Sequence, residues 1–574
     1  MRPATLIGLL LFVTILVLLL PGTGKAPVPT PIHVEPIAGI VVPHHDLVAT
    51  TRAELFTALK EKRPSVRTVI LVSPNHYASG RASVQSSKEL WELANGSIEP
   101  NTDVITALVT AGVAAEEPGS FANEHGVKNV LANLEQTYPE AMIVPLILKS
   151  STTREEVGAL HDALAASCAD CVLVASVDFS HDQPALLADL HDQLARRALE
   201  QLDDELLLGR VETDSAPSLL LLTRWARSHQ TERFTEFAHT NSGSLLADPE
   251  IATTTHLFGW YEPGDRIVPT PGVTFLLGGD MMFDRGVAHA TVFAGKPYSS
   301  ILGGLGERLF WGTDLAMANL EGPISDVPVP DNIEPNNLTF NFPPETVDAL
   351  TYLHLNAVSL GNNHTTNAGT SGLDTTRRLL DEAGIAWASG PTAADVGHTA
   401  SVTGQGLTLH VIAPHVLAGV TDLTAQIEAL AADPANRIIV FPHWGNEYQP
   451  RHSASQARLA HAWIDAGADA VIGAHPHVVQ DAELYKNRPI IYSLGNLVFD
   501  QQFSAETQRG LLVGGEFTGS ELKLLFLPTV SQNLIPRLAT GTERTRRLDA
   551  LLKPFGEYVQ ATPAGALVVL PMSE

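Results

Sequence analysis

Short apolar segments of strand type, separated by helical segments, recur along most of this chain and limit the folds that it can adopt. IAGIVVP, from Ile37 to Pro43, precedes a helical stretch from Thr51 to Lys62, and TVILVSPNH follows. Similar apolar runs occur at AMIVPLIL and CVLVASVDFS, with helical segments such as Arg154 to Ser167 and Pro184 to Glu200 beside them. This alternation predicts an α/β fold with a largely parallel sheet. In such a sheet, ligands bind at the carboxyl ends of the strands.

The length of the chain predicts more than one hydrophobic core. At 574 residues it is expected to contain two or three domains, of which we predict two large ones. A segment rich in proline and glycine, Gly259 to Gly272, ends the first series of strands and helices and is the best domain boundary. We therefore predict a linker at 262–272 between a first domain at 37–261 and a second domain at 273–574.

The N-terminal region is expected to direct export. Leu6 to Leu20 form an uncharged apolar run between Arg2 and Pro21, which fits a signal peptide or a short signal anchor within residues 1–24. Cleavage stays open, although the lack of a small-x-small site favours the anchor. A proline-rich linker at 25–36 would hold the body away from the bilayer. The expected location is extracytoplasmic, either membrane-anchored or, if the segment is cleaved, secreted.

Composition excludes some classes of partner. A formal net charge of −27 argues against nucleic acid and against polybasic docking on anionic lipid, but it does not hinder cation binding. A hydrophobic content of 44% with 17% charged residues is typical of packed globular domains. Two cysteines, Cys168 and Cys171, exclude a disulfide framework. They could form a local disulfide, a redox pair or half of a zinc knuckle, or remain two thiols beside a strand.

Polar residues gather where the strands of the first domain are predicted to end. They are His44, His45 and Asp46; Asn75 and His76; Glu124 and His125; and Asp178, Ser180 and His181. The motifs that contain them, PHHD, SPNH, NEHGVKNVL and SVDFSH, resemble those of the Memo family, also called AmmeMemoRadiSam system protein B, over roughly Ile37 to Tyr261.

That resemblance implies an extradiol-dioxygenase-like α/β domain and a metal-type site. In the family this site uses the histidines of the first two motifs, here His44 and His76, and a later cysteine. VETDSAP has no cysteine and offers Asp214 instead. Two histidines and a carboxylate suit iron, which would allow dioxygenase-like redox chemistry. The alternative is a binding or scaffolding module without metal. His125, Asp178 and His181 are expected to line the site.

In the second domain, a series of apolar runs ends in oxygen and nitrogen donors. His475 and His477, in GAHPHVV, are expected to face one point, because residues two apart in extended backbone lie on one side. Several such donors without thiolates fit divalent ions such as Mn, Fe, Zn or Mg. The donors are Asp280; Asn319 and Glu321; Asn362, Asn363 and His364; His443 and Glu447; His475 and His477; and Asn496 and Asp500.

The same residues carry a second resemblance. GGDMMFDRG, ANLEGPISD, GNNHTTNAG, HWGNEY, GAHPHVVQ and YSLGNLVFD resemble the ordered motifs of the CapA family, poly-γ-glutamate capsule biosynthesis proteins with a metallophosphatase-like domain. A calcineurin-like α/β/β/α sandwich is implied. So is a centre for one or two metal ions, with His364 as general acid or transition-state donor and Asp280 also in a catalytic role. The implied ligands are Asp280, Glu321, Asn363, His443, His475 and His477, with Asn319 lining the site.

One departure from the calcineurin-like pattern is visible, because Met282 stands where a ligand histidine is usual. The first metal would therefore have fewer protein ligands. A long loop, Pro323 to Pro344, is expected to cover the site. The expected function is phosphoester hydrolysis in the synthesis, export or release of an anionic surface polymer such as poly-γ-glutamate, with the polymer synthesis machinery as partner. The alternatives are a non-catalytic scaffold for capsule export and redox chemistry in the first domain.

Overall fold

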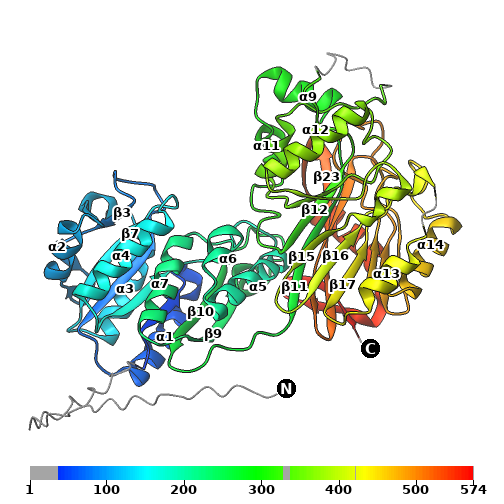
Figure 1. The fold of residues 1–574 in the computed structure, drawn as a ribbon. Helices are drawn as coiled ribbons and strands as arrows, with labels where there is room; N and C mark the ends of the chain where they lie inside the picture. Colours follow the sequence, from blue (N-terminus) through cyan, green and yellow to red (C-terminus); the bar gives the residue numbers. More distant parts are fainter. Residues whose placement is uncertain (1–35, 328–336, 420–421, 573–574) are drawn as a thin grey trace, which may run out of the picture. The chain divides into compact units, whose positions relative to one another are not determined.

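The computed structural model describes residues 36–327, 337–419 and 422–572 (Figure 1). The predicted signal or anchor segment at 1–24 and nearly all of the linker at 25–36 therefore lie outside the described residues. Within the described ranges, the structure contains no helix with the length and apolar character needed to cross a membrane.

The first half contains an eight-stranded sheet in the order β6-β3-β7-β2-β8-β1-β10-β9. Its centre is parallel, because β2 pairs in parallel with β7 and β8, and β8 pairs in parallel with β1. The pairs β3·β7, β1·β10 and β10·β9 are antiparallel, so the largely parallel expectation holds for the centre of the sheet. The strands are β1 (Gly39–Val42), β2 (Thr68–Pro74), β3 (Val84–Ser86), β6 (Ala115–Glu116), β7 (Met142–Leu148), β8 (Val172–Ser176), β9 (Arg233–Asn241) and β10 (Thr255–Glu262).

Helices cover both faces of this sheet because its strands are apolar on both sides. In β1, Ile40 and Val42 pack against α1 and α3, while Val41 faces the opposite core with α4 and α7. The parallel order brings the ends of β1, β2 and β8 to one edge, where His44, Asn75 and Asp178 follow. The helices are α1 (Ala49–Lys62), α2 (Thr102–Thr110), α3 (His125–Thr137), α4 (Arg154–Ser167), α5 (Ala185–Gln201), α6 (Asp204–Gly209), α7 (Ala216–Ser228) and α8 (Ser242–Leu246).

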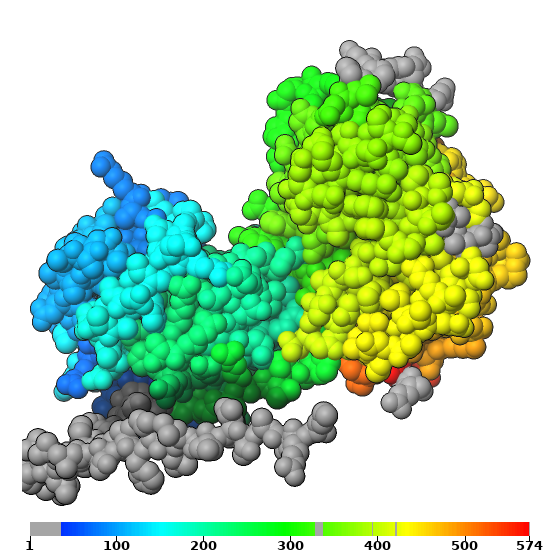
Figure 2. All heavy atoms as spheres, viewed as in Figure 1, coloured from blue at the N-terminus to red at the C-terminus, as the bar shows by residue number. Residues whose placement is uncertain are grey.

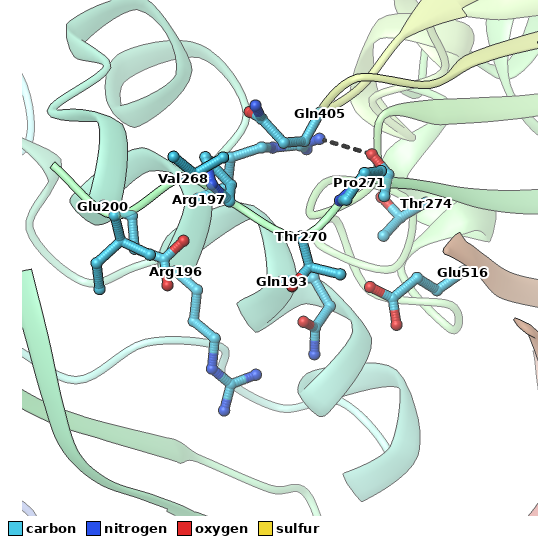
Figure 3. Close-up of a pocket in the computed structure, with 13 residues that line it drawn as sticks. Gln193, Arg196, Arg197, Glu200, Val268, Thr270, Pro271, Thr274, Gln405 and Glu516 are labelled. Carbon is cyan, nitrogen blue, oxygen red and sulfur yellow. Dashed lines mark hydrogen bonds between the residues drawn. The ribbon is translucent and has the colours of Figure 1, made fainter. Parts of the chain in front are cut away.

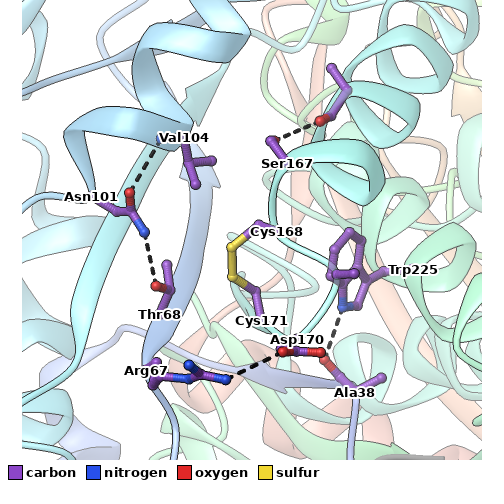
Figure 4. Close-up of a disulfide and its surroundings, with 12 residues drawn as sticks. Ala38, Arg67, Thr68, Asn101, Val104, Ser167, Cys168, Asp170, Cys171 and Trp225 are labelled. Carbon is purple, nitrogen blue, oxygen red and sulfur yellow. Dashed lines mark hydrogen bonds and ion pairs between the residues drawn. A yellow bond between two sulfur atoms is a disulfide. The ribbon is translucent and has the colours of Figure 1, made fainter. Parts of the chain in front are cut away.

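A disulfide joins Cys168 and Cys171 in the turn between α4 and β8 (Figure 4). Both cysteines are buried. Nearby, the indole nitrogen of Trp225 on α7 donates to the Ala38 carbonyl, 3.1 Å away, just before β1. Of the alternatives that the spacing leaves open, the structure has the local disulfide.

The second half contains two sheets packed face to face. One has ten strands, with the path β14-β13-β12-β11-β22-β23-β26-β25 plus β21 on β11 and β24 on β23; the other is β15-β16-β17-β18-β20-β19. The strands are β11 (Gly272–Met281), β12 (Leu315–Leu320), β13 (Ala357–Ser359), β14 (Ala386–Ala388), β15 (Ala400–Thr403), β16 (Thr408–Ile412), β17 (Asn436–Val440), β18 (Ala470–Ile472), β19 (Ala482–Tyr485), β20 (Arg488–Ile491), β21 (Asn496–Val498), β22 (Arg509–Thr518), β23 (Glu521–Gln532), β24 (Ile535–Leu538), β25 (Val559–Thr562) and β26 (Gly565–Pro571).

Three apolar cores define the layers of this half. Leu315 and Met317 of β12 pack between the sheets, while Ala316 and Ala318 face an outer core with α9, α11 and α12. A third core joins the smaller sheet to α13 and α14. In the space-filling view, this half carries the colours from green through yellow to orange (Figure 2). This is the predicted α/β/β/α sandwich. The helices are α9 (Arg285–Ala290), α11 (Thr346–Tyr352), α12 (Gly369–Glu382), α13 (Thr424–Ala431), α14 (Ala454–Asp465) and α15 (Gly541–Leu552).

Candidate metal centre

Parallel strands deliver the second-half donors to one buried point. Asp280 is the last residue but one of β11, Glu321 follows β12, and His475 and His477 follow β18. All four residues are at most 4% exposed. One ligand atom each of Glu321, His475 and His477 lie within 4.8 Å of one another, which is the spacing of ligands around a shared ion.

Asp280 connects the two sheets through its carboxylate. The Asn319 amide donates to Oδ1 over 2.8 Å, and the His475 backbone N–H donates to Oδ2 over 3.2 Å. His477 Nδ1 lies 3.3 Å from the same Oδ2. A carboxylate held by donors from both sheets is fixed in place before any ligand binds, so its position is set by the fold.

The backbone around the two histidines differs from the expectation. His475 and His477 have φ values of +96° and +57°. The segment is therefore not extended, and the prediction of extended backbone was wrong. Left-handed backbone at a non-glycine residue costs on the order of 1–3 kcal/mol and persists only where the surroundings impose it. Here Asp280 holds the His475 N–H, and the Tyr448 N–H donates to the Pro476 carbonyl over 2.8 Å. The imidazoles still converge, with ring centroids 5.8 Å apart.

Buried atoms in the cluster lack hydrogen-bond partners. They are both carboxylate oxygens of Glu321 and the Nδ1 atom of His475. Two imidazole nitrogens lie near Glu321, His477 Nε2 at 3.5 Å and His443 Nε2 at 3.8 Å. An unsatisfied buried polar group costs about 1–3 kcal/mol. A divalent cation would satisfy these atoms, and oxygen and imidazole donors suit such ions, so the residues fit a metal.

His443, Asn363 and Asn319 form the other side of the cluster. His443 Nε2 donates to the Asn363 side-chain oxygen over 2.8 Å, and its Nδ1 atom lies 3.3 Å from the Asn319 amide nitrogen. His443 is buried and Asn363 is exposed. The two predicted ligand atoms therefore meet at the solvent side of the cluster.

Burial and charge set the protonation of the cluster. Burial raises the pKa of Glu321 well above its usual value, and the Asp280 charge adds to this. Burial alone would lower the pKa of His477, but the carboxylates of Glu321 and Asp280 outweigh it and raise that pKa to about 9. Burial, together with His477, lowers the pKa of His475 to about 3. Without a metal, His477 is therefore the cation of the cluster, while His475 is neutral and has a lone pair available.

Metal affinity is expected to rise with pH, because a metal that binds His477 must displace its proton. Below a pKa of about 9 the ring is protonated, so a tenfold drop in proton concentration should tighten divalent-ion binding by up to tenfold between pH 6 and 8. Titration calorimetry with Mn²⁺ in buffers of different ionisation enthalpy measures this directly. We expect at least one proton released per ion, because the pKa of the ligand Glu321 is raised as well. A pH-independent affinity with no proton release would remove His477 from the ligand set.

His364 borders the cluster and does not join the group around Glu321. Its Nδ1 atom lies 2.9 Å from the Asn367 side-chain oxygen, and its ring packs on Phe340 with centroids 4.2 Å apart. Burial lowers the pKa of His364, so the free ring is neutral at pH 7. Phe340 belongs to the predicted covering loop, of which residues 328–336 lie outside the described residues. The described part of that loop therefore contacts the predicted proton donor.

Other donors at the strand ends do not enter the cluster. Met282 is fully buried in the outer core, where its sulfur accepts the Asp284 N–H, so Met282 itself supplies no ligand to the cluster. Asp500 forms an ion pair with Arg285, and Glu447 is exposed. These positions end apolar runs in the same way as the ligands do, but their side chains are paired elsewhere or lie in solvent.

Two residues near the cluster lie outside the predicted ligand set, although the sequence placed Asn496 among the strand-end donors. Asn496, on β21, faces His477, with its side-chain oxygen 3.0 Å from His477 Nδ1. The guanidinium of Arg285 lies 4.9 Å from the Phe340 ring centroid, beside the wall that packs on His364. The asparagine of YSLGN was a visible signal for the first, because it ends an apolar run like the others. For Arg285 the contact arises only from tertiary packing.

The first half brings its predicted ligands together at the sheet edge. Asp214 Oδ2 lies 3.3 Å from His44 Nε2 and 3.6 Å from His76 Nε2. His76 Nδ1 lies 2.5 Å from the Glu124 carboxylate. Burial by itself lowers the pKa of His76, but Asp214 and Glu124 raise it to about 9. Both histidines thus lie near one carboxylate oxygen, so the structure brings together the three residues of the predicted first-half site.

Three further predicted residues differ in their relation to this group. Asp178 joins it, with Oδ2 at 3.3 Å from His44 Nε2, and His125 stacks on His76 with centroids 4.0 Å apart. His181 does not join, because its Nδ1 contacts the Phe179 carbonyl and its N–H donates to Glu212. The sequence did not single out His256, which is fully buried with its Nδ1 3.5 Å from Asp178.

A cavity of about 210 Å³ lies beside α5 and contains none of the predicted ligands (Figure 3). Its lining includes Arg196, Arg197 and Glu200 of α5, the connecting segment 267–271, and Glu516. The Gln405 N–H donates to the Gly272 carbonyl at its edge, over 2.7 Å. The cavity lies where α5, the connecting segment 267–271 and Glu516 meet, and none of the predicted metal ligands lines it.

The fold and the donor set define a two-part α/β protein whose second part is a metallophosphatase-like sandwich. Residues 274–501 match the family model of the bacterial capsule synthesis protein PGA_cap, and residues 25–244 match that of Memo-like proteins. The chain thus joins a Memo-like region to a CapA-like capsule-synthesis region, in that order, as the motifs predicted.

Relatives of both regions are known. The chain is 29% identical over 252 residues to the PGA biosynthesis protein CapA of Bacillus subtilis, covering 41% of this chain and 65% of the relative. It is 33% identical over 198 residues to the capsule biosynthesis protein CapA of Bacillus anthracis, covering 31% and 48%. A MEMO1 family protein of Methanopyrus kandleri is 28% identical over 200 residues, covering 34% and 68%. The chain therefore spans less than two thirds of the length of the two Bacillus relatives.

Proposed function

We propose that the second half is a metal-dependent phosphoesterase that acts in the synthesis, export or release of an anionic surface polymer such as poly-γ-glutamate. The observation that supports this most strongly is the buried carboxylate of Glu321, which has no hydrogen-bond partner and lies beside His475 and His477. A buried carboxylate without a hydrogen-bond partner is costly, and a bound cation would offset that cost. The capsule names of the relatives supply the polymer.

The chain's residues divide the work of such a reaction. A single ion, or the more buried of two ions, would be held by Asp280, Glu321, His475 and His477. On the solvent side of the cluster, Asn363 and His443 would supply the remaining ligands. A bound divalent ion supplies charge neutralisation and a water of lowered pKa. His364 would donate a proton to the leaving oxygen, a contribution of about 10² to 10⁴-fold. The negative charge of a bound phosphate favours the protonated ring, which offsets the lowered pKa of His364 in the free protein.

The test is metal analysis of the purified full-length chain with hydrolysis assays on p-nitrophenyl phosphate and bis(p-nitrophenyl) phosphate. We expect retained divalent metal, a loss of at least 100-fold in rate on treatment with EDTA, and recovery with added Mn²⁺. A chain that retains no metal at this site and cleaves neither ester would favour the alternative, a non-catalytic scaffold for capsule export.

The first half supports a second candidate activity, metal-dependent redox chemistry. The supporting observation is that His44 and His76 both lie within 3.6 Å of one oxygen of Asp214, which together form a set of two histidines and a carboxylate. We expect the chain to bind Fe²⁺ there and His44→Ala to remove that iron. His161→Ala is the matched control, because His161 lies on α4 and contacts Asp162 and Ser228, outside this group. Equal iron content in His44→Ala and wild type would exclude this site.

A further inference from the structure

A cavity of about 600 Å³ lies behind the loops that carry the second-half histidines. Its size is that of sites for small ligands or short chain segments. Val479, Ala482 and Leu551 supply apolar lining. Four cationic side chains also line it, namely Arg451, Arg509, Arg547 and Lys553, against the two carboxylates of Asp481 and Glu506.

The lining has more positive than negative side chains, whereas the chain as a whole is negatively charged. The protein has 36 lysines and arginines against 63 aspartates and glutamates, so a random lining would be acidic. Asp481 is already engaged, because its Oδ1 lies 3.0 Å from His452 Nδ1. The cavity therefore has a positive surface in a negatively charged protein, which concentrates anions at this position.

The cations are only partly neutralised by the protein. Arg509 contacts Glu506 at 3.5 Å and Glu543 at 3.2 Å. Arg547 is held instead by two backbone carbonyls, those of Thr529 and Gly510. Within the ranges that the structure describes, no carboxylate pairs with Arg547, and the exposed side chains of Arg451 and Lys553 have no ion-pair partner either. The charge of three cations is thus not balanced by a carboxylate, and two of them, Arg451 and Lys553, are exposed to a ligand.

The cavity shares its wall with the metal centre. Its lining segment 479–482 follows His477 directly, and the Gln480 amide donates to the carbonyls of Gln449 and Arg451, over 2.9 and 3.1 Å. On the other wall, Glu506 precedes Thr507, whose carbonyl accepts from the Asn496 amide. Asn496 in turn contacts His477. A ligand in the cavity therefore lies against the segments that position the ligand histidines.

We infer that this cavity binds a stretch of an acidic polymer with regularly spaced carboxylates, and that it holds the polymer next to the metal centre. Guanidinium groups bind carboxylates in a bidentate manner, and several cations in one cavity select a chain with repeated charges over a single anion. The apolar lining suits the methylene groups between the carboxylates of such a chain. This inference rests on the proposed function only for the kind of polymer.

The test is calorimetric binding of a ten-residue oligomer of γ-linked glutamate to the full-length chain, with EDTA present so that the metal centre is empty. Arg451→Glu combined with Lys553→Glu should weaken binding at least tenfold, because both side chains are exposed and their replacement leaves the core intact. Arg233→Glu combined with Arg458→Glu is the matched control. Both residues are exposed and lie outside the cavity, and the change in net charge is the same. The control should weaken binding less than twofold.

Several outcomes would overturn the inference: no binding to wild type, equal weakening in both double variants, or stronger competition by tripolyphosphate than by the glutamate oligomer. The last result would assign the cavity to phosphate groups. Hydrolysis of p-nitrophenyl phosphate by the same samples separates the two proposals. Binding of the oligomer without hydrolysis would contradict the phosphoesterase proposal and support the polymer site in the cavity. Hydrolysis without binding would support the phosphoesterase proposal and contradict the polymer site.

Discussion

Glu321→Gln is expected to remove the bound divalent metal and to lower kcat/KM for phosphoesters at least 10³-fold, while the metal-free protein becomes more stable than wild type. The loss follows because an amide cannot supply the charged oxygen ligand at the centre of the cluster. The gain follows because burial and Asp280 raise the pKa of Glu321, so its ionised form destabilises the metal-free fold. At pH 7 the neutral amide avoids that cost, on the order of 1–3 kcal/mol.

The sign of this stability change separates a ligand from a structural residue. Because the folded-state pKa of Glu321 is raised, its favourable contribution is present below pH 4.5 and is lost as pH rises, so the variant should gain stability most clearly at neutral pH. Glu483→Gln is the control: this half-buried carboxylate accepts from Tyr492 over 2.6 Å and contacts His461 at 2.8 Å. That variant should lose stability and keep its metal. Metal content, denaturant unfolding with EDTA and hydrolysis rates measure all three effects. A Glu321→Gln variant that retains full metal would contradict the assignment.

The fold was predictable from the sequence because apolar runs and their end residues carry most of the information. The run before Asp280 and the run before Glu321 both predict strands, and parallel pairing of β11 with β12 then brings the two carboxylates to one edge. Cys168 and Cys171 were open to several interpretations, since spacing alone does not fix the distance between two sulfur atoms. β22 was missed because GLLVGGEFT interrupts its apolar pattern with glycines.

The local geometry of the site could not be predicted, because it is imposed by residues distant in the chain. The positive φ values of His475 and His477 depend on Asp280, 195 residues before His475, and on the loop that contains Tyr448. Ion pairing in the folded chain also gives different roles to carboxylates that occur in similar sequence contexts. Asp280 and Asp500 both follow apolar runs, yet only Asp500 has an arginine, Arg285, within reach. Which carboxylate stays available for a metal is decided by these tertiary contacts.

His364→Gln is expected to lower kcat by 10² to 10⁴-fold for an alkyl phosphoester but by less than tenfold for p-nitrophenyl phosphate, with metal content unchanged. An alkoxide leaving group needs a proton in the transition state, whereas p-nitrophenolate leaves without one. The ring lies outside the group formed by Glu321, His475 and His477, so its removal leaves that group intact. Parallel measurement of both substrates and of metal content tests the role.

The contacts of His364 also predict a smaller loss of activity when a residue that orients its ring is replaced. Asn367 holds the Nδ1 side of the ring, 2.9 Å away, so Asn367→Ala should misorient the donor without removing it. Its loss in kcat should therefore be smaller and should show the same dependence on the leaving group. If His364→Gln instead slowed both substrates equally, the ring would act on phosphate binding or on metal affinity. Proton donation requires that the deficit grow with leaving-group pKa, because only then does the missing proton limit bond cleavage.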